Sequence, residues 1–138
     1  MNAEEILEFV QGNPVFFLAT VKNDQPCVRG MMLYRADGIG IIFAAGAEKE
    51  LNRQLLENPA VELCFYRPVD NRQVRIGGAV EFLEDPDIKR DAAEKIPFLK
   101  ARRDAGGDAS IALYRLRHGV ATVWSPESGT DSKEFITL

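Results

Sequence analysis

The sequence predicts a mainly β fold, a small antiparallel barrel that is closed or nearly closed, with helices at its periphery. Seven apolar segments rich in β-branched and aromatic residues are joined mostly by short turns, which favours antiparallel pairing. Three segments carry clear helical signals, and the strands are too few and too interrupted for an open α/β sheet. The expected strands are residues 15–21, 27–34, 39–43, 61–66, 72–83, 111–117 and 120–125.

Length and composition indicate an ordinary globular protein with a single domain over residues 1–138. Apolar residues make up 46% of the chain and charged residues 28%, while the net charge of −4 argues against a nucleic-acid partner. No apolar run is long enough to span a membrane, and the acidic N-terminal segment is unlike a signal peptide. Cys27 and Cys64 lie inside expected strands, so we expect two reduced thiols in a cytoplasmic protein.

The first third of the chain predicts a helix followed by a run of strands. Asn2 and Glu5 have the spacing of a capping box at the start of a helix over residues 2–11, and Pro14 follows its end. Pro26 can open the second strand because its missing N–H is tolerated there. Asp37-Gly38 is a strong signal for a tight hairpin between the second and third strands.

The middle of the chain predicts a loop of small residues, a helix and a bent strand. Residues 44–47 carry only alanine and glycine, which allows close approach of the backbone to another group. The helix expected over residues 48–57 ends at Asn58-Pro59. Gly77-Gly78 in the middle of the fifth strand indicates a bulge or a sharp bend, as barrels require.

The last third predicts a capped helix and a final hairpin. Asp85-Pro86 has the pattern of an N-cap followed by proline in the first turn, and the helix runs to about residue 96, where Pro97 interrupts it. Residues 98–103 can add a short helix. The two last strands would form a hairpin around His118-Gly119.

Two basic residues mark a candidate anion site. Arg29 lies near the start of the second strand, and Lys49 lies in the first turn of the helix expected over residues 48–57. They can converge on one phosphate, because a helix start offers unpaired N–H groups and small residues permit close approach. Glu48 would repel a phosphate if it pointed inward, and would not interfere if it pointed outward.

Three stretches carry a resemblance to a known family: VFFLATV…DQPCVRGMMLY, KELNRQLLENPAVELCFY and RQVRIGGAVEFLEDPD. In order and spacing they resemble the pyridoxamine 5′-phosphate oxidase-like family of FMN-binding split barrels, over most of the chain. The resemblance implies an antiparallel split β-barrel that binds FMN at a homodimer interface. An apolar surface rich in Met31, Met32, Phe65 and Trp124 would be hidden in such a dimer.

The resemblance also assigns the FMN site residue by residue. Arg29 and Lys49 match the phosphate ligands, residues 30–33 match the strand that lines the isoalloxazine, and Gln73 matches a glutamine near the ring. Trp124 matches an aromatic residue that the partner subunit brings to the flavin. Without the resemblance, Gln73 reads as an outward polar residue, and Trp124 as a core or interface residue. The expected cofactor-binding residues are Arg29, Gly30, Met31, Met32, Phe43, Ala44, Lys49, Gln73 and Trp124, and no metal site is expected.

Two departures argue against the vitamin B6 oxidase itself. Tyr34 stands where that enzyme has a lysine, and the stretch after Trp124 contains no arginine or histidine to bind a substrate phosphate. The chain looks more like short flavin-binding members, some of which resemble nitroimidazole-resistance reductases. The resemblance therefore favours the fold and FMN, and disfavours pyridoxamine phosphate as substrate.

The sequence leaves two functions open. The first is an FMN-dependent oxidoreductase acting on an unidentified small molecule, with Tyr34 as a weak candidate for proton transfer. The second is a non-catalytic flavin carrier, store or sensor. Space over the flavin would discriminate between them, since Trp124 and residues 98–103 could block the ring. A barrel holding haem or deazaflavin is a third alternative, and the single histidine, His118 in an expected turn, argues against haem.

Overall fold

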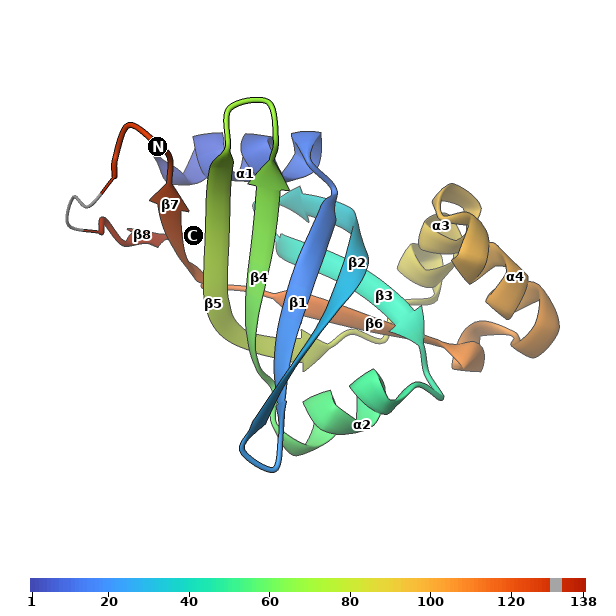
Figure 1. Ribbon diagram of the computed structural model, residues 1–138. Helices are drawn as coiled ribbons and strands as arrows, with labels where there is room; N and C mark the ends of the chain where they lie inside the picture. Colours follow the sequence, from blue (N-terminus) through green and yellow to red (C-terminus); the bar gives the residue numbers. More distant parts are fainter. Residues whose placement is uncertain (130–132) are drawn as a thin grey trace.

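The computed structural model describes residues 1–129 and 133–138 and shows a β-barrel with four α-helices around it (Figure 1). The elements, in chain order, are α1 (Ala3–Gly12), β1 (Val15–Lys22), β2 (Gln25–Asp37), β3 (Gly40–Gly46), α2 (Glu50–Glu57), β4 (Ala60–Arg67), β5 (Arg72–Phe82), α3 (Pro86–Lys95), α4 (Pro97–Gly106), the 3-10 turn η1 (Asp108–Ser110), β6 (Ile111–Leu116), β7 (Val120–Trp124) and β8 (Ile136–Thr137).

Six antiparallel strands close into a ring. Their order is β4-β1-β2-β3-β6-β5, and pairing between β4 and β5 completes the barrel. β7 extends the sheet outward from β5, and the short β8 pairs with β7. The sequence predicted β7 but not β8. The predicted antiparallel barrel with peripheral helices is therefore confirmed.

Two strands are long enough to serve both halves of the barrel. β2 pairs with β1 over residues 25–32 and then with β3 over residues 33–37. β5 pairs with β4 over residues 72–79, and its last residues, 80–82, pair with β6. The register between β4 and β5 runs unbroken through Gly77-Gly78, so the glycines form a bend without a bulge.

The hairpin expected around His118-Gly119 is wrong. β6 and β7 do not pair with each other; they follow one another along the same edge of β5, where Leu116 is opposite Val80 and Val120 is opposite Gly77. The bend of β5 makes this possible, because each half of β5 offers its edge to a different strand. Gly119 is buried in the link, and a Cβ there would lie 2.7 Å from the Ile76 side chain.

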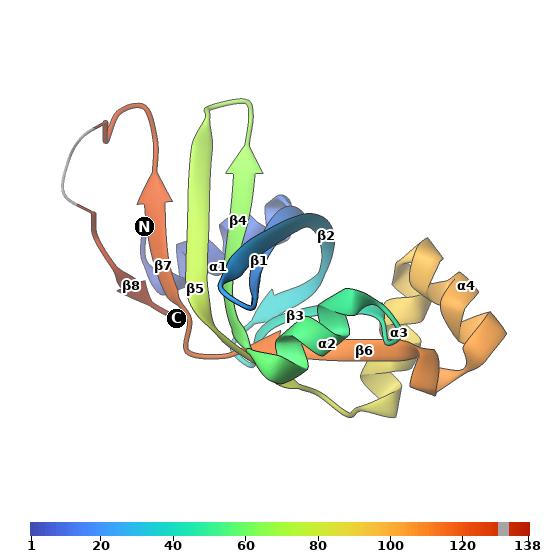
Figure 2. The ribbon, with the colours of Figure 1, turned by 60° about the horizontal axis from the view of Figure 1, so that its bottom comes forward.

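The helices cover different parts of the barrel. α1, which has the expected capping box of Asn2 and Glu5, covers one end, and α2 lies at the other (Figure 1). α3 and α4 stand to one side of the barrel, beyond β3 and β6 (Figure 2). α4 is longer than the short helix predicted over residues 98–103. No helix in the described part of the chain is both long and apolar enough to cross a membrane.

The buried apolar residues form two clusters, one inside the barrel and one under α3 and α4. The barrel interior is filled by aromatic rings, with the Phe16 and Phe65 rings stacked at 4.9 Å and the Phe43 ring in contact with Phe16. A second apolar cluster lies under α3 and α4, where Leu99 of α4 is fully buried. The two clusters fix α2 and α4 on either side of the region where β2 leaves β3.

Candidate functional site

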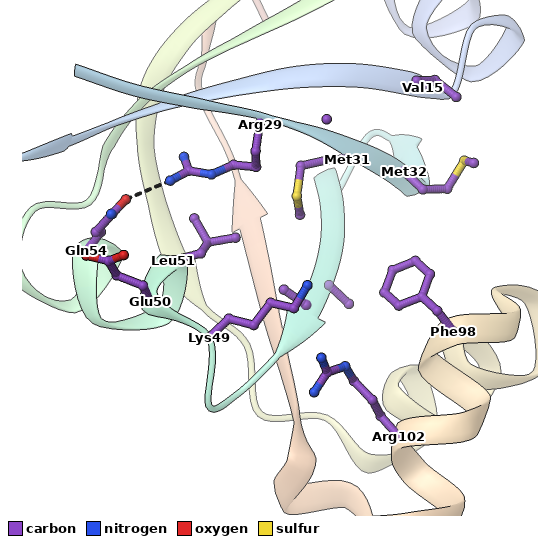
Figure 3. Close-up of a pocket in the computed structure, with 13 residues that line it drawn as sticks. Val15, Arg29, Met31, Met32, Lys49, Glu50, Leu51, Gln54, Phe98 and Arg102 are labelled. Atoms are coloured by element: carbon purple, nitrogen blue, oxygen red, sulfur yellow. Dashed lines mark hydrogen bonds between the residues drawn. The ribbon is translucent and has the colours of Figure 1, made fainter.

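A cavity of about 800 Å³ opens where β2 and β3 separate (Figure 3). The ladder between the two strands ends at the pair of Leu33 and Phe43, so residues 29–32 of β2 have β1 on one side only. Side chains of α2 and α4 close the remaining walls. The cavity is lined by Val15, Arg29, Gly30, Met31, Met32, Ala44, Ala45, Lys49, Glu50, Leu51, Gln54, Phe98 and Arg102.

Backbone polar groups face this cavity. The Leu33 N–H donates to the Pro14 carbonyl on the β1 side, and hydrogen-bonded pairs alternate along an antiparallel ladder. The N–H and C=O groups of Gly30 and Met32 therefore point away from β1 and toward the gap. By the same rule, the backbone groups of Ala44 point away from β6 and toward β2. The gap thus offers donors and acceptors from both of its strands.

Arg29 reaches the cavity as a side chain that is already held in place. Its Nη1 donates to the Thr20 hydroxyl at 2.7 Å and to the Leu18 carbonyl at 3.3 Å, and its Nη2 donates to Gln54 Oε1 at 2.8 Å. Thr20 and Gln54 are both buried, and the Thr20 hydroxyl also donates to Gln54 Oε1 at 2.6 Å. The guanidinium is therefore oriented by partners from β1 and α2.

The sequence interpretation missed Thr20 and Gln54, although each left a signal. Thr20 is a hydroxyl residue that continues the inward row of Phe16 and Leu18 on β1. Gln54 is a polar residue on the buried stripe of α2, beside Leu51 and Leu55. A polar side chain on an apolar face must find a buried partner, which is the role that Arg29 fills here.

Lys49 is the N-cap of α2 and not part of its first turn, because the helix begins at Glu50. Its side chain extends into the cavity from the segment that precedes α2 (Figure 3). Glu50, which also lines the cavity, accepts a hydrogen bond from the Lys22 ammonium. This contact lowers the pKa of the Glu50 carboxyl and raises the pKa of Lys22, so the negative charge of Glu50 is partly neutralised.

Glu48 does not line the cavity. Its carboxylate forms an ion pair with Arg102 of α4, and its side chain is 62% exposed. Arg102 does line the cavity, together with Phe98 one turn earlier on the same helix. The sequence interpretation named residues 98–103 only as a segment that could block the ring, and the packing of α4 beside β3 is what brings these two side chains to the cavity.

Three of the expected residues lie outside this cavity. Phe43 is fully buried, with its ring 5.4 Å from those of Phe16 and Tyr114. Gln73 and Trp124 are opposite each other on β5 and β7, on a separate part of the sheet. The structure brings together the other six: Arg29, Gly30, Met31, Met32, Ala44 and Lys49.

Tyr34 is engaged away from the cavity. Its hydroxyl donates to Asp91 of α3, and Lys95 pairs with the same carboxylate at 2.9 Å. Burial, together with the hydrogen bond to Asp91, raises the pKa of Tyr34 to about 12. The phenol thus links β2 to α3 through a hydrogen bond, and its raised pKa makes it poorly suited to donate a proton near neutral pH. Within residues 1–129 and 133–138, no group of three His, Cys, Asp or Glu side chains could hold a metal ion.

Fold and site together define a class: a split antiparallel barrel with a basic cavity between its diverging strands. A match to the pyridoxamine 5′-phosphate oxidase family extends over residues 3–114. The chain belongs to this family.

Curated relatives carry the same name. The chain is 40% identical over 67 residues to the pyridoxine/pyridoxamine 5′-phosphate oxidase of Anaeromyxobacter dehalogenans, covering 49% of this chain and 33% of that protein. It is 28% identical over 141 residues to a putative pyridoxamine 5′-phosphate oxidase of Caenorhabditis elegans, covering 88% of this chain and 60% of that protein. The matched stretches thus span from a third to three fifths of these relatives.

Solved structures share the whole fold. A NimC/NimA family protein from Clostridium acetobutylicum superposes with a TM-score of 0.79 at 26% identity, covering 98% of this chain and 91% of that one. A pyridoxamine 5′-phosphate oxidase-related, FMN-binding protein from Nostoc punctiforme gives a TM-score of 0.69 at 16% identity, covering 99% and 94%. PhzG from Burkholderia lata, in complex with tetrahydrophenazine-1-carboxylic acid, gives 0.60 at 16% identity, covering 98% and 89%. At 16% identity the last two show likeness of fold alone.

Proposed function

We propose that this protein binds FMN in the cavity between β2, β3, α2 and α4. The observation that carries the proposal is the convergence of Arg29 and Lys49 on one cavity beside the start of a helix. Guanidinium groups, ammonium groups and the free N–H groups of a helix start are all typical ligands of a phosphate. The volume of about 800 Å³ is that of a small-molecule site, so the residues present fit this cofactor.

The ring of the cofactor would lie along the free edge of β2. The backbone groups of Gly30 and Met32 face this side of the cavity, where they can pair with the polar edge of an isoalloxazine. Met31 and Leu51 supply apolar contacts. Bound FMN would supply hydride or electron transfer, while these residues hold and orient it.

A homodimer is the second part of the proposal. Val15, Phe17 and Val28 are 56%, 51% and 69% exposed on the outer face of β1 and β2. Phe17 is opposite Cys64 on β4, and Tyr66 of β4 continues the same exposed face. An exposed apolar sheet face is typical of a subunit interface.

This face differs in one respect from the sequence interpretation. Phe65, which was expected on the interface, is fully buried in the barrel, and its neighbour Tyr66 points outward. Tyr66 is opposite Gln73, which is opposite Trp124, so both belong to the outer face. A second subunit packed on this face would therefore bring its own Gln73 and Trp124 toward a cavity that it helps to close.

For the activity we propose an oxidoreductase or reductase acting on a small molecule, in a cytoplasmic setting that suits the two free cysteines. Pyridoxamine phosphate is disfavoured as substrate because Tyr34, at the position where the vitamin B6 oxidase has a lysine, is hydrogen-bonded to Asp91. One observation favours the alternative of a carrier, store or sensor: Phe98, 48% exposed at the cavity, would shield part of a bound ring.

The first test is the absorbance spectrum of freshly purified protein, with mass spectrometry of any released chromophore. A flavin spectrum with the mass of FMN is expected. A colourless protein that does not take up added FMN at micromolar concentration would contradict the proposal. Reoxidation of the bound, reduced flavin by candidate acceptors over many turnovers would favour the enzyme, and a single turnover would favour the carrier.

A variant test addresses the phosphate directly. Arg29→Ala combined with Lys49→Ala should weaken FMN binding by about 100-fold or more, because each removes a charged hydrogen bond worth about 1.5–3 kcal/mol. Riboflavin, which lacks the phosphate, should bind within a few-fold of the wild type. Arg53→Ala, on the exposed side of α2, is the matched control and should change neither affinity. Equal loss of both ligands would show that the pair does not hold the phosphate.

A further inference from the structure

We infer that Arg102 of α4 is a third cationic ligand of the FMN phosphate, and that it also neutralises Glu48 beside that phosphate. This inference rests on the proposed FMN site and adds a residue that the resemblance does not assign to the cofactor. Residues of α4, a helix distant in sequence from Arg29 and Lys49, would then help the protein to bind FMN in preference to riboflavin, which lacks the phosphate.

The first argument is the fit between Arg102 and the end of β3. A Cβ added to Gly46 would overlap the Arg102 guanidinium, with its Nε only 2.9 Å away. The guanidinium therefore lies directly over the backbone of Gly46, one residue before the loop that leads to Lys49. An alanine at position 46 would force the end of the Arg102 side chain to move. The cation thus sits against the small-residue stretch that would cradle the phosphate.

The second argument is how firmly α4 delivers this side chain. Leu99, one turn earlier, is fully buried in the cluster under α3 and α4. The Ser110 hydroxyl donates to the Arg102 carbonyl at 3.0 Å and so ties the end of the helix to the start of β6. Arg103, the next residue, points elsewhere and pairs with Asp108 at 2.8 Å. Position 102 alone therefore brings a guanidinium of α4 to the cavity.

The third argument is the charge balance at this end of the cavity. Glu48 does not line the cavity, but its carboxylate reaches Arg102, which does, so its charge would repel a phosphate bound there if it were unpaired. Among the described residues, Glu48 is the only ion-pair partner of Arg102, and it meets Nη1. A guanidinium carries five N–H donors, so the others stay available for phosphate oxygens. The exposed ion pair is weak enough to adjust when a dianion binds.

The experiment compares FMN and riboflavin binding, measured by quenching of flavin fluorescence, in the protein and its variants. Arg102→Ala should weaken FMN binding about tenfold or more and leave riboflavin binding within about twofold. Arg102→Lys keeps the positive charge but loses the planar guanidinium, so its FMN affinity should fall less than that of Arg102→Ala. Arg103→Ala, on the same helix with its partner outside the cavity, should match the wild type. Circular dichroism confirms that each variant folds.

A second substitution tests the part of Glu48. In the Arg102→Ala background, Glu48→Gln should recover several-fold in FMN affinity, because it removes the carboxylate that Arg102 no longer neutralises. Absence of recovery would overturn the neutralising role. Unchanged FMN binding in Arg102→Ala, or equal loss of FMN and riboflavin, would overturn Arg102 as a phosphate ligand. Failure of the FMN site itself is a separate outcome, since the wild type would then bind no FMN.

Discussion

Arg29 shows, at the scale of the residue, how a charged side chain is prepared for a ligand before the ligand arrives. Its guanidinium is half-buried and is held by Thr20 and Gln54, which are themselves buried. Burying a charge is costly unless hydrogen bonds compensate, and here two side chains and a carbonyl do so. Because the rotamer is fixed in advance, less conformational entropy is lost on binding an anion.

Tyr34 is the residue for which the structure predicts a pH dependence. Its pKa is raised from 10.0 to about 12, so the folded protein favours the neutral phenol. The neutral Tyr34 phenol therefore contributes to the free energy of unfolding. This contribution is complete below pH 10 and is lost as the pH rises toward 12. Tyr34→Phe should therefore flatten the loss of stability across this interval, measured by urea unfolding at each pH.

A direct titration supplies the control for Tyr34. Asp91→Asn removes the carboxylate that faces the phenol and should move the tyrosinate titration, followed by ultraviolet absorbance, part of the way back toward pH 10. The shift is partial because burial is the largest cause of the raised pKa. An unmoved titration would show that Asp91 does not influence the phenol.

At the scale of the element, the cavity exists because β2 changes partners. Its first part pairs with β1 and its second part with β3, so the barrel opens where the exchange takes place. The hairpin after β2 then holds β3 in register through the pair of Asp37 and Gly40. Misplacing this turn would shift Ala44 and the rest of the cavity wall with it.

Gly40 carries the conformational demand of that hairpin. Its φ is +124°, and a Cβ would lie 2.9 Å from the Leu116 carbonyl oxygen. Gly40→Ala should therefore lower the free energy of unfolding by about 1–3 kcal/mol. Gly38→Ala is the matched control two residues away, since nothing lies within 4 Å of its Cβ position and its φ is ordinary. It should be neutral or slightly stabilising in the same denaturant titration, and an equal cost at both glycines would contradict this account of the turn.

At the scale of the whole molecule, the outer face of β1, β2 and β4 exposes large apolar side chains that a second subunit would cover. Phe17 lies near its middle, between Gly30 of β2 and Cys64 of β4. Gly30 also lines the cavity, so the proposed interface and the proposed cofactor site share residues. Dimer formation and FMN binding should then strengthen each other.

Phe17→Lys tests this coupling. A charge in the middle of the apolar face should convert the dimer to a monomer, measured by light scattering after size-exclusion chromatography, and should weaken FMN binding about tenfold or more. Val69→Lys is the control, because Val69 is 88% exposed in the β4–β5 loop and should leave the dimer intact. A wild type that is monomeric at high concentration would contradict the proposed dimer outright.

Local patterns predicted most of the elements, and local patterns together with the family resemblance predicted about half of the residues that line the cavity. Alternation and capping signals predicted the bounds of α1, of α2 and of most of the strands to within two residues. Their order also placed Arg29 and Lys49 near one another, because adjacent strands and the following helix are neighbours in space. The family followed from the same stretches of sequence.

Tertiary structure alone decided the rest. β6 and β7 lie end to end along β5, where a hairpin between them was predicted. A turn signal in the sequence indicates that the chain changes direction, but it does not indicate which strand the next segment will pair with. Arg102 and Phe98 reach the cavity only through the packing of α4, a contact between segments distant in sequence. The sequence by itself determined which side chains could bind an anion; the closed barrel decided which of them meet, because long-range contacts depend on how whole elements pack.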